Sequence, residues 1–541
     1  MKRLLAVLLL AAPAAAGEKP LKPTNDIPAM IEEHDAAGLN HVYGGPWEFF
    51  VGGGGAAFDC NGDRKPDMLL AGGKNPAKLY VNESPVGGEL RFREFPLDLG
   101  KDATMATGAY PLDIDGDGQM DVALLRAGRN ILLKGGQDCS FTVANRDWKF
   151  DGGSEWTTGF SARWEEGLNF PTLAFGNYVD RSAPGTPWGT CHDNFLLRPD
   201  QGDKVSYSQP VALAPGFCSL SMMFTDWNKS GEPSLRITND RQYYRGGEEQ
   251  LWRVQPGKPP VAYSRADGWQ KVVIWGMGIA EADLDADGVP EYALTSMGDT
   301  KLQKLDEDAD EGSPVYRDIA FERGATAHRP YAGGDLKPST GWHAEFADFN
   351  NDSLPDLFIA KGNVEAMGDF AQFDPNNLLL GQWDGRFAEA GEQAGIVMKA
   401  KGRGALIADF NLDGTLDLAV INRGSPASLF RNSGSKADDV MRPMGNWLQV
   451  ELRQPGGNRM AVGAMVNVKI GTRTMNRYVQ VGGGHAAGHL GWLHVGLGNS
   501  ERAELRVKWP DGEWSHPYRV FANQFVIVDR AKPQAAYWYP D

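Results

Sequence analysis

The sequence predicts an all-β chain in which a seven-bladed β-propeller precedes a small C-terminal β domain. Three observations support this prediction. An acidic loop followed by an alternating apolar stretch recurs about every 55 to 65 residues, glycine accounts for 67 of the 541 residues, and long helical patterns are few. Repeats of this length with several short strands each are typical of propeller blades.

The acidic loop identifies the repeat units. Five strong copies lie at 57–73, 113–125, 281–296, 346–362 and 407–424, and a weaker copy lies at 224–240. The weaker copy keeps Asp226, Asn228 and Ser230 but has Ser234 in place of the last acid. The first acids of the second copy and of this weaker copy, Asp113 and Asp226, are about twice the usual distance apart in the sequence. This spacing predicts a hidden unit within 173–199 that has lost its acidic loop. We therefore expect seven units.

Each unit contains four short strand patterns. The sequence also indicates how the ring closes. The seventh unit has a third strand at 427–434 but no fourth. The segment 30–39 resembles 387–396, a fourth strand, and is expected to complete the last blade and remove its open edge. The propeller is therefore expected to span residues 27–435.

The loops place oxygen-bearing side chains at positions 1, 3, 5 and 9, which suits calcium. Ca²⁺ takes roughly six to eight oxygens at ~2.3–2.6 Å, and carboxylates this close repel one another unless a cation compensates them. An EF-hand is excluded because it needs a Glu at position 12, where these loops have Leu124, Leu294 and Val420 before a strand pattern. The expected ligands of several structural Ca²⁺ ions are Asp59, Asn61, Asp63, Asp67, Asp113, Asp115, Asp117, Asp121, Asp226, Asn228, Ser230, Asp283, Asp285, Asp287, Glu291, Asp348, Asn350, Asp352, Asp356, Asp409, Asn411, Asp413 and Asp417.

Metal-free turns are the competing interpretation, since Asn and Asp side chains cap their own backbone in many Asx-rich turns. Two loops also depart from the pattern. The glycine at position 6 is replaced by Arg64 in one and by Ser353 in another, which strains the turn if that position needs positive φ. Neither change removes a carboxylate, so calcium remains the expectation.

The loops and the strands that follow them resemble FG-GAP or VCBS-type repeats. The segments 446–470 and 496–514 resemble the ASPIC/UnbV domain, and the matching positions are Asn458, Ala461, Gly463, Ala464, Gly496, Gly498, Trp509, Pro510 and Gly512. The combination is similar to the cartilage acidic protein family and its bacterial exported relatives. The resemblance implies a propeller followed by a β domain at about 446–530, and it specifies fold better than function.

Composition and targeting signals restrict location and partners. A net charge of −16 argues against nucleic acid or an anionic membrane as partner. Residues 1–16 are typical of a signal peptide, and no later stretch approaches the ~20 apolar residues of a membrane helix, so a secreted or periplasmic protein is expected. Cys60, Cys139, Cys191 and Cys218 allow two disulfides in three connectivities, of which Cys191–Cys218 is favoured.

The expected function is non-enzymatic binding of a protein or carbohydrate partner through one propeller face, because loops on a rigid scaffold suit recognition. Trp156, Trp164, Trp188 and Trp342 are candidates for stacking on sugar rings, although most of the 16 tryptophans are expected between blades. A subunit of a surface or periplasmic assembly is a further possibility.

The alternative function is a carbohydrate-active enzyme, either a polysaccharide lyase or a dehydratase. Its candidate residues are His328, Arg329, Tyr331, Lys337 and His343. Some propeller-fold lyases use His, Tyr and Arg to neutralise a uronate and abstract its proton. A ligand-contacting or structural loop is the competing interpretation of this segment.

Three further histidines occur in the glycine-rich segment 481–498. His485 and His489 have the spacing of a helical zinc pair, but the surrounding glycines oppose a helix. On a strand these two share a face, while His494 has the opposite parity. A polar β-hairpin in the small domain is expected here.

Overall fold

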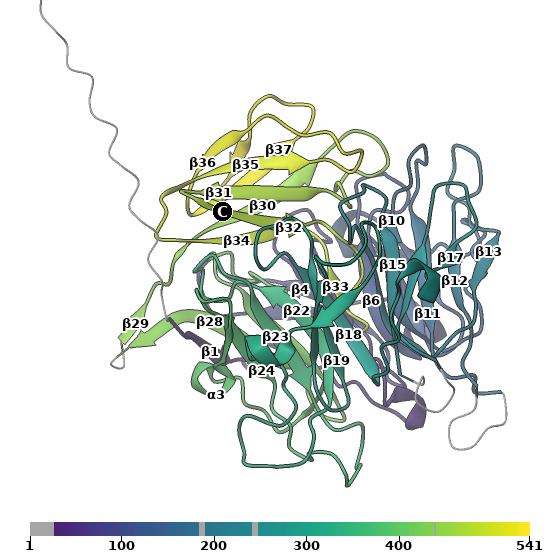
Figure 1. Ribbon diagram of the computed structural model, residues 1–541, viewed down its shortest axis with the longest axis horizontal. Helices are drawn as coiled ribbons and strands as arrows, with labels where there is room; N and C mark the ends of the chain where they lie inside the picture. Colours follow the sequence, from purple (N-terminus) through teal and green to yellow (C-terminus); the bar gives the residue numbers. More distant parts are fainter. Residues whose placement is uncertain (1–25, 183–189, 241–246, 438–439, 541) are drawn as a thin grey trace, which may run out of the picture.

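The computed structural model describes residues 26–182, 190–240, 247–437 and 440–540. The expected signal peptide at 1–16 and Trp188 lie outside these ranges. Seven of the sheets in the described part form a ring, and two more form a separate domain above it (Figure 1). The predicted all-β propeller fold is confirmed. None of the described helices is long and apolar enough to span a membrane.

Blades 1 to 4 follow the chain, each as an antiparallel sheet whose first strand is innermost. Blade 1 comprises β2 (Gly55–Phe58), β3 (Asp67–Leu70), β4 (Lys78–Asn82) and β5 (Phe92–Phe95). Blade 2 comprises β6 (Ala106–Leu112), β7 (Asp121–Arg126), β8 (Ile131–Gly135) and β9 (Phe141–Val143). Blade 3 comprises β10 (Thr157–Arg163), β11 (Thr172–Asn177), β12 (Asn194–Leu197) and β13 (Pro210–Leu213). Blade 4 comprises β14 (Ser219–Thr225), β15 (Ser234–Asn239), β16 (Gln250–Arg253) and β17 (Val261–Ala262).

Blades 5 to 7 complete the ring. Blade 5 comprises β18 (Gly276–Ala282), β19 (Glu291–Ser296), β20 (Lys301–Leu305) and β21 (Tyr316–Asp318), followed by the single turn α2 (Ala320–Arg323). Blade 6 comprises β22 (Gly341–Ala347), β23 (Asp356–Lys361), β24 (Asn377–Gly381) and β25 (Phe387–Glu389), followed by α3 (Gly391–Ala394). Blade 7 comprises β26 (Lys401–Ala408), β27 (Asp417–Arg423), β28 (Ser428–Ala437) and β1 (Pro28–Glu32), with β29 (Val440–Arg442) beside β28.

The N-terminal strand closes the ring. β1 pairs antiparallel with β28, with Met30 opposite Asn432 and Glu32 opposite Phe430. Directly after β1, the Glu33 carboxylate lies 2.8 Å from the Arg431 guanidinium. Pairing the first strand of the chain with the last blade removes the open sheet edge.

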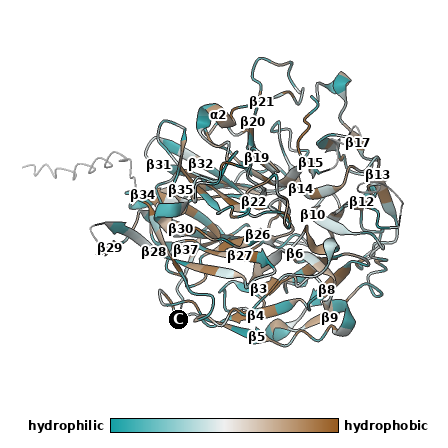
Figure 2. Cartoon of the chain, turned by 90° about the horizontal axis from the view of Figure 1, so that it is seen from below, coloured by the Kyte–Doolittle hydropathy of each residue, from teal (hydrophilic) through white to brown (hydrophobic). Residues whose placement is uncertain are grey.

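Apolar packing between blades forms the core. The inner strands β6, β10 and β14 are buried at every position, because both faces of each strand pack against neighbouring blades. Figure 2 looks onto the ring from the end opposite the C-terminal domain and shows apolar segments in the strands around its centre. Leu69, Leu79, Val122 and Leu133, for example, share one core between blades 1 and 2.

The C-terminal domain is a β-sandwich, and we refer to it as the sandwich. One sheet comprises β34 (Leu493–Gly498), β30 (Asn446–Arg453), β37 (Gln524–Asp529) and β38 (Ala536–Trp538), and the other comprises β32 (Arg473–Tyr478), β31 (Met465–Ile470), β35 (Arg502–Lys508) and β36 (Tyr518–Phe521). Buried aliphatic side chains from both sheets fill its core.

Two disulfides join neighbouring blades. Cys191–Cys218 connects blade 3 to the start of blade 4, which confirms the pairing favoured from the sequence. Cys60–Cys139 connects the acidic loop of blade 1 to the segment after β8 of blade 2, across 79 residues of chain. Both therefore hold the ring together between blades.

Candidate metal centres and the junction of the two domains

Six acidic loops lie at one end of the propeller, which we call the loop face. They occupy residues 59–67, 113–121, 226–234, 283–291, 348–356 and 409–417, each between the first two strands of its blade. The position 1 carboxylate accepts the position 6 amide, at 2.8 Å both from Arg64 to Asp59 and from Ser353 to Asp348. Position 6 has positive φ in every one of these loops, 65° at Arg64 and 76° at Ser353. The two non-glycine residues therefore adopt the strained conformation that the sequence predicted.

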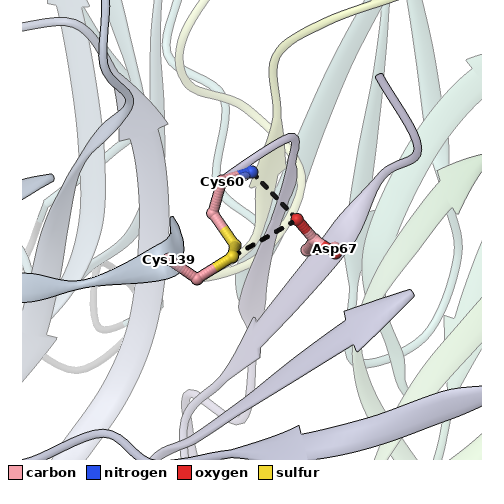
Figure 3. A group of neighbouring side chains, drawn as sticks. All are labelled: Cys60, Asp67 and Cys139. Carbon is pink, nitrogen blue, oxygen red and sulfur yellow. Dashed lines mark hydrogen bonds between the residues drawn. A yellow bond between two sulfur atoms is a disulfide. The ribbon is translucent and has the colours of Figure 1, made fainter. Parts of the chain in front are cut away.

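The acid at position 9 fixes the loops of blades 1, 2, 6 and 7 to the bodies of their blades. Asp67 accepts the amides of Cys60 at 2.9 Å and of Asn82, at the end of β4, at 2.8 Å. Figure 3 shows Asp67 beside the Cys60–Cys139 disulfide, which leaves neither cysteine as a free thiolate for a metal. Asp121, Asp356 and Asp417 make the same two bonds. These carboxylates are thus held in place by the backbone itself.

The residues present fit a hard cation such as Ca²⁺. Acid oxygens gather within 4.8 Å of one another in two loops, from Asp113, Asp115 and Asp121 and from Asp283, Asp285 and Glu291. The buried atoms Asp113 Oδ1, Asp283 Oδ1 and Asn411 Oδ1 have no hydrogen-bond partner in the described part of the chain. Oxygen donors of this kind are what Ca²⁺ prefers. The other predicted ligands stay predictions, as does calcium itself.

Burial makes these carboxyl groups hard to ionise without a cation. Burial and the neighbouring acids raise the pKa of Asp113 to about 6 and the pKa of Asp121 to about 8. Burial likewise raises the pKa of Glu291 to about 8. A bound divalent ion would offset the repulsion and keep all three ionised.

Lysine side chains lie against two of the loops. Lys134 of β8 forms ion pairs with Asp115 and, at 2.6 Å, with Asp117. Lys304 of β20 pairs with Asp285 and, at 2.9 Å, with Glu307. These internal cations already offset part of the acidic charge in blades 2 and 5.

Blade 3 shows how a loop without the acidic ladder is satisfied. The loop that joins β10 to β11 is 164–171, so the lost loop lies before the segment 173–199 in which the sequence analysis placed it. It buries Glu165, whose oxygens lie 2.8 Å and 2.9 Å from Nε of Arg198. A protein cation therefore compensates the buried carboxylate of this loop.

The weak loop of blade 4 keeps the fold but loses a carboxylate. Asp226 still accepts the Gly231 amide at 3.0 Å. At position 9, Ser234 accepts the indole N–H of the buried Trp227 at 3.3 Å. Among the described residues, the acid oxygens do not gather here as they do in blades 2 and 5.

The sandwich covers the loop face and contacts the loops directly, which the sequence did not predict. Asn476 of β32 donates to Asp283 Oδ2 at 2.6 Å, and Gln449 of β30 donates to Asp409 Oδ2 at 3.2 Å. His494 lies 2.7 Å from Asn351 in the loop of blade 6. The loops of blades 6 and 7 are consequently the most buried, and burial together with Asp352 raises the pKa of Asp348 to about 8.

Residues 480–491 leave the sandwich and enter the centre of the ring, and we call them the axial insert. Its backbone bonds to five inner strands, through Leu490 N to Ala57 O at 3.1 Å, Ala109 N to Ala486 O at 3.2 Å, Ala162 N to Val481 O at 3.1 Å, Gly483 N to Met222 O at 2.8 Å and Gly484 N to Ile279 O at 2.7 Å. Its short strand β33 (Gly488–His489), which is labelled in Figure 1, pairs in parallel with β2. The expectation of a polar hairpin within the small domain is therefore wrong, because these glycines let the chain approach the inner strands closely.

His485 is fully buried at the tip of the axial insert. Its amide donates to His343 Nδ1 at 3.0 Å, and its Nε2 accepts the Gly52 amide at 3.1 Å. Its ring centroid lies 5.1 Å from that of Trp342. Burial, with the nearby Arg403 charge, lowers the pKa of His485 to about 3, so the ring is neutral.

The structure does not bring the other predicted clusters together. His343 is buried against the axial insert, whereas His328, Arg329, Tyr331 and Lys337 are exposed on the connection to β22, at the other end of the blade. The expectation that Trp156 and Trp342 stack on sugars is wrong, since both are fully buried between blades; Trp164 is partly exposed.

The ring of blades with acidic loops, capped by a sandwich, defines a repeat-type β-propeller with an appended β domain. A family model described as "FG-GAP-like repeat" matches residues 59–124 and 348–420, and one described as "ASPIC and UnbV" matches 454–535. The chain therefore carries FG-GAP-like repeats in the propeller and an ASPIC and UnbV domain in the sandwich.

Curated relatives share part of this chain. Cartilage acidic protein 1 of Mus musculus is 27% identical over 244 residues, which cover 44% of this chain and 34% of that protein. The Homo sapiens protein of the same name is 27% identical over 245 residues, covering 44% and 33%. The chain thus spans about a third of the length of these relatives. A solved structure of BBS1N in complex with ARL6DN aligns with a TM-score of 0.41 and 7% identity, covering 74% of this chain and 96% of that chain.

Proposed function

We propose that the protein is an exported, calcium-stabilised binding scaffold whose partner docks at the end of the propeller opposite the sandwich. We call this end the free face. The observation that carries the proposal is that other parts of the chain occupy the loop face and the centre of the ring. The sandwich covers the loop face and the axial insert enters the ring, so the free face is the end of the propeller that is left open to a protein partner.

Apolar side chains gather on two long loops of the free face, 324–340 and 362–376. Tyr331 is 47% exposed, Leu336 74%, Met367 37% and Phe373 59%. Both loops belong to connections that leave the blades at the end away from the acidic loops. Exposed apolar residues grouped in this way are typical of protein interaction sites, which favours a protein partner over a polysaccharide here.

Hydrogen bonds brace the two loops against each other. The Ala371 amide donates to Pro338 O at 3.0 Å, and Lys337 Nζ donates to Gly368 O at 2.6 Å. Beneath them, the buried Asp374 carboxylate lies 2.9 Å from Lys361 Nζ. A pre-organised surface loses little conformational entropy on binding.

Two further features support export and calcium. Disulfides persist in oxidising compartments, and this chain forms two. The acidic loops offer oxygen donors that suit Ca²⁺ at the concentrations found outside cells.

Site-specific photo-crosslinking tests the docking surface. A photoreactive phenylalanine analogue would replace Leu336 in the full chain expressed in its own cells, and the control would carry it at Val261, which is 53% exposed on the outer strand of blade 4. We expect one discrete adduct from position 336 and none from position 261. The absence of an adduct at 336, or the same adducts at both positions, would contradict the proposal.

A further inference from the structure

A cavity of about 740 Å³ lies between the loop face and the sandwich, around the axial insert. We propose that this cavity binds a carbohydrate and that His489 is its central hydrogen-bonding residue. The proposal concerns a different surface from the free face and does not depend on the partner that docks there.

A carboxylate between two histidines forms the polar centre of the cavity. Glu345 Oε2 lies 3.1 Å from His343 Nε2, and Glu345 Oε1 lies 3.3 Å from His489 Nδ1. The His485 amide donates to His343 Nδ1, so the neutral His343 ring carries its proton on Nε2 and donates it to Glu345. The axial insert therefore fixes the direction of this hydrogen-bond chain.

The same chain orients His489 toward the cavity. Nδ1 of His489 lies on the side of the ring that faces the Glu345 carboxylate, which leaves Nε2 for a ligand. The His489 side chain is 42% exposed, in contrast to the buried His343 and His485. His489 Nε2 is thus the ring atom that a ligand hydroxyl can reach.

The remaining lining matches a hydroxylated ring. Arg477, Tyr478 and Gln480 also line the cavity, and their buried atoms Nη2, Oη and Oε1 have no hydrogen-bond partner in the described part of the chain. Trp492 lines the same cavity. A hydroxyl group both donates and accepts, which suits a mixed set of donors and acceptors. Sites for small ligands combine apolar walls with a few oriented polar groups in this way, at volumes of roughly 300 to 1,000 Å³.

Charge and geometry disfavour other ligand classes. Four arginines, Arg64, Arg453, Arg459 and Arg477, line the cavity together with a larger number of acidic side chains, so the lining has no excess of positive charge that would select a phosphate or another anion. Among the described residues, the groups whose ligand atoms lie within 4.8 Å of one another do not include His343, Glu345 and His489 together. The charge of the lining disfavours an anion and the geometry disfavours a metal ion, so a neutral sugar is the ligand class that fits.

Glycan binding by the intact mature chain provides the test. A glycan array in calcium-containing buffer would identify a bound sugar, and calorimetric titration would give its affinity for the wild type and three variants. We expect His489→Ala to weaken binding at least tenfold and Glu345→Gln, which loosens the orientation of His489, to weaken it by about tenfold. The control His516→Ala, at an exposed site on the sandwich, should bind like the wild type.

The thermal midpoint of each variant separates a lost contact from a lost fold. His489 is partly exposed, so its truncation should leave the midpoint close to that of the wild type. The proposal is overturned if no glycan binds, if His489→Ala binds with unchanged affinity, or if the purified protein carries a transition metal on these histidines. Crosslinking from Leu336 would be unaffected by any of these outcomes, so failure here is distinguishable from failure at the free face.

Discussion

Arg64 and Ser353 occupy the same strained loop position but differ in what surrounds them. Arg64 Nε lies 3.2 Å from Glu451 of the sandwich, and its guanidinium stacks 5.4 Å from the Trp538 ring centroid. These contacts account for an arginine at a position that favours glycine. Ser353 is fully buried, and its hydroxyl has no hydrogen-bond partner in the described part of the chain. Nothing in the structure explains the serine.

Ser353→Gly should stabilise the protein. Glycine adopts positive φ without strain and removes a buried hydroxyl that makes no hydrogen bond, while it adds entropy to the unfolded chain. We expect a net gain of about 1 kcal/mol in the free energy of unfolding, measured by urea denaturation. The matched control is Gly231→Ser, at the same loop position with open space around it, which should lose a similar amount. A loss on Ser353→Gly would contradict this account of the strain.

His41 makes stability depend on pH in mildly acidic solution. Burial lowers the pKa of His41 from 6.5 to about 4, and its Nε2 lies 2.8 Å from Ala71 O. Between these two pH values the unfolded chain binds a proton at His41 that the folded chain does not bind. The free energy of unfolding therefore falls as the pH decreases from 6.5 to 4, and below pH 4 the contribution of His41 no longer changes. The full loss amounts to about 3 kcal/mol.

Urea denaturation at several pH values between 4 and 7 checks this expectation. His41→Gln, which keeps a donor for Ala71 O, should show a shallower loss than the wild type. His328→Gln, at an exposed position, should lose stability as steeply as the wild type. Equal slopes in the wild type and His41→Gln would show that another group dominates.

At the scale of elements, the axial insert depends on close backbone approach to the inner strands. A Cβ on Gly54 would lie 1.9 Å from Ala486 O, a backbone atom that cannot move aside as a side chain does. The axial insert and the backbone directly before β2 can therefore pack this closely only because residue 54 is a glycine.

Gly54→Ala should displace the axial insert and destabilise the protein by about 3 kcal/mol, the upper range for forced overpacking. Gly44→Ala is the control, because an added Cβ there meets nothing within 4 Å. Limited proteolysis should cleave the 480–491 segment faster in Gly54→Ala only. Equal cleavage in both variants would contradict a tight fit at the ring centre.

The sequence predicted elements whose signals are local and missed those that depend on tertiary contacts. The alternation after each acidic loop and the turn residues within it predicted the blades, and the match of 30–39 to a fourth strand anticipated the position of β1. The destination of 480–491 could not be predicted, because glycine and alanine patterns do not specify the surface they approach. Tryptophan exposure was likewise misjudged, since Trp156 lies directly before β10 and Trp342 lies within β22, and both are buried beside these inner strands.

At the scale of the whole molecule, the acidic loops connect the two domains. Loops of blades 5, 6 and 7 receive Asn476, His494 and Gln449 from the sandwich. Without a cation, burial raises the pKa of Asp409 and of Asp417 well above the ordinary value. Metal binding at these loops and docking of the sandwich should therefore stabilise each other.

Calcium removal should loosen this junction. Chelation is expected to lower the thermal midpoint by several degrees, since a site at hundredfold excess over its Kd contributes about 2.7 kcal/mol. Hydrogen exchange should increase in 348–356, in 409–417 and in β30, but not in β17 of blade 4. Asp409→Asn should show a reduced calcium effect. No shift with chelator, and no calcium in metal analysis of the purified protein, would refute structural calcium.

The pairing of β1 with blade 7 and the entry of the axial insert into the ring have a consequence for folding. Residues 28–32 close the edge of blade 7 by pairing with residues 430–435, and residues 480–491 make inner contacts with β2, more than 400 positions after that strand. Such distant contacts raise the contact order, which slows folding. The ring can assemble its blades in sequence, but its centre is completed only when residues 480–491 are available, so chains that have not reached them would expose unpaired inner-strand backbone to proteases and chaperones.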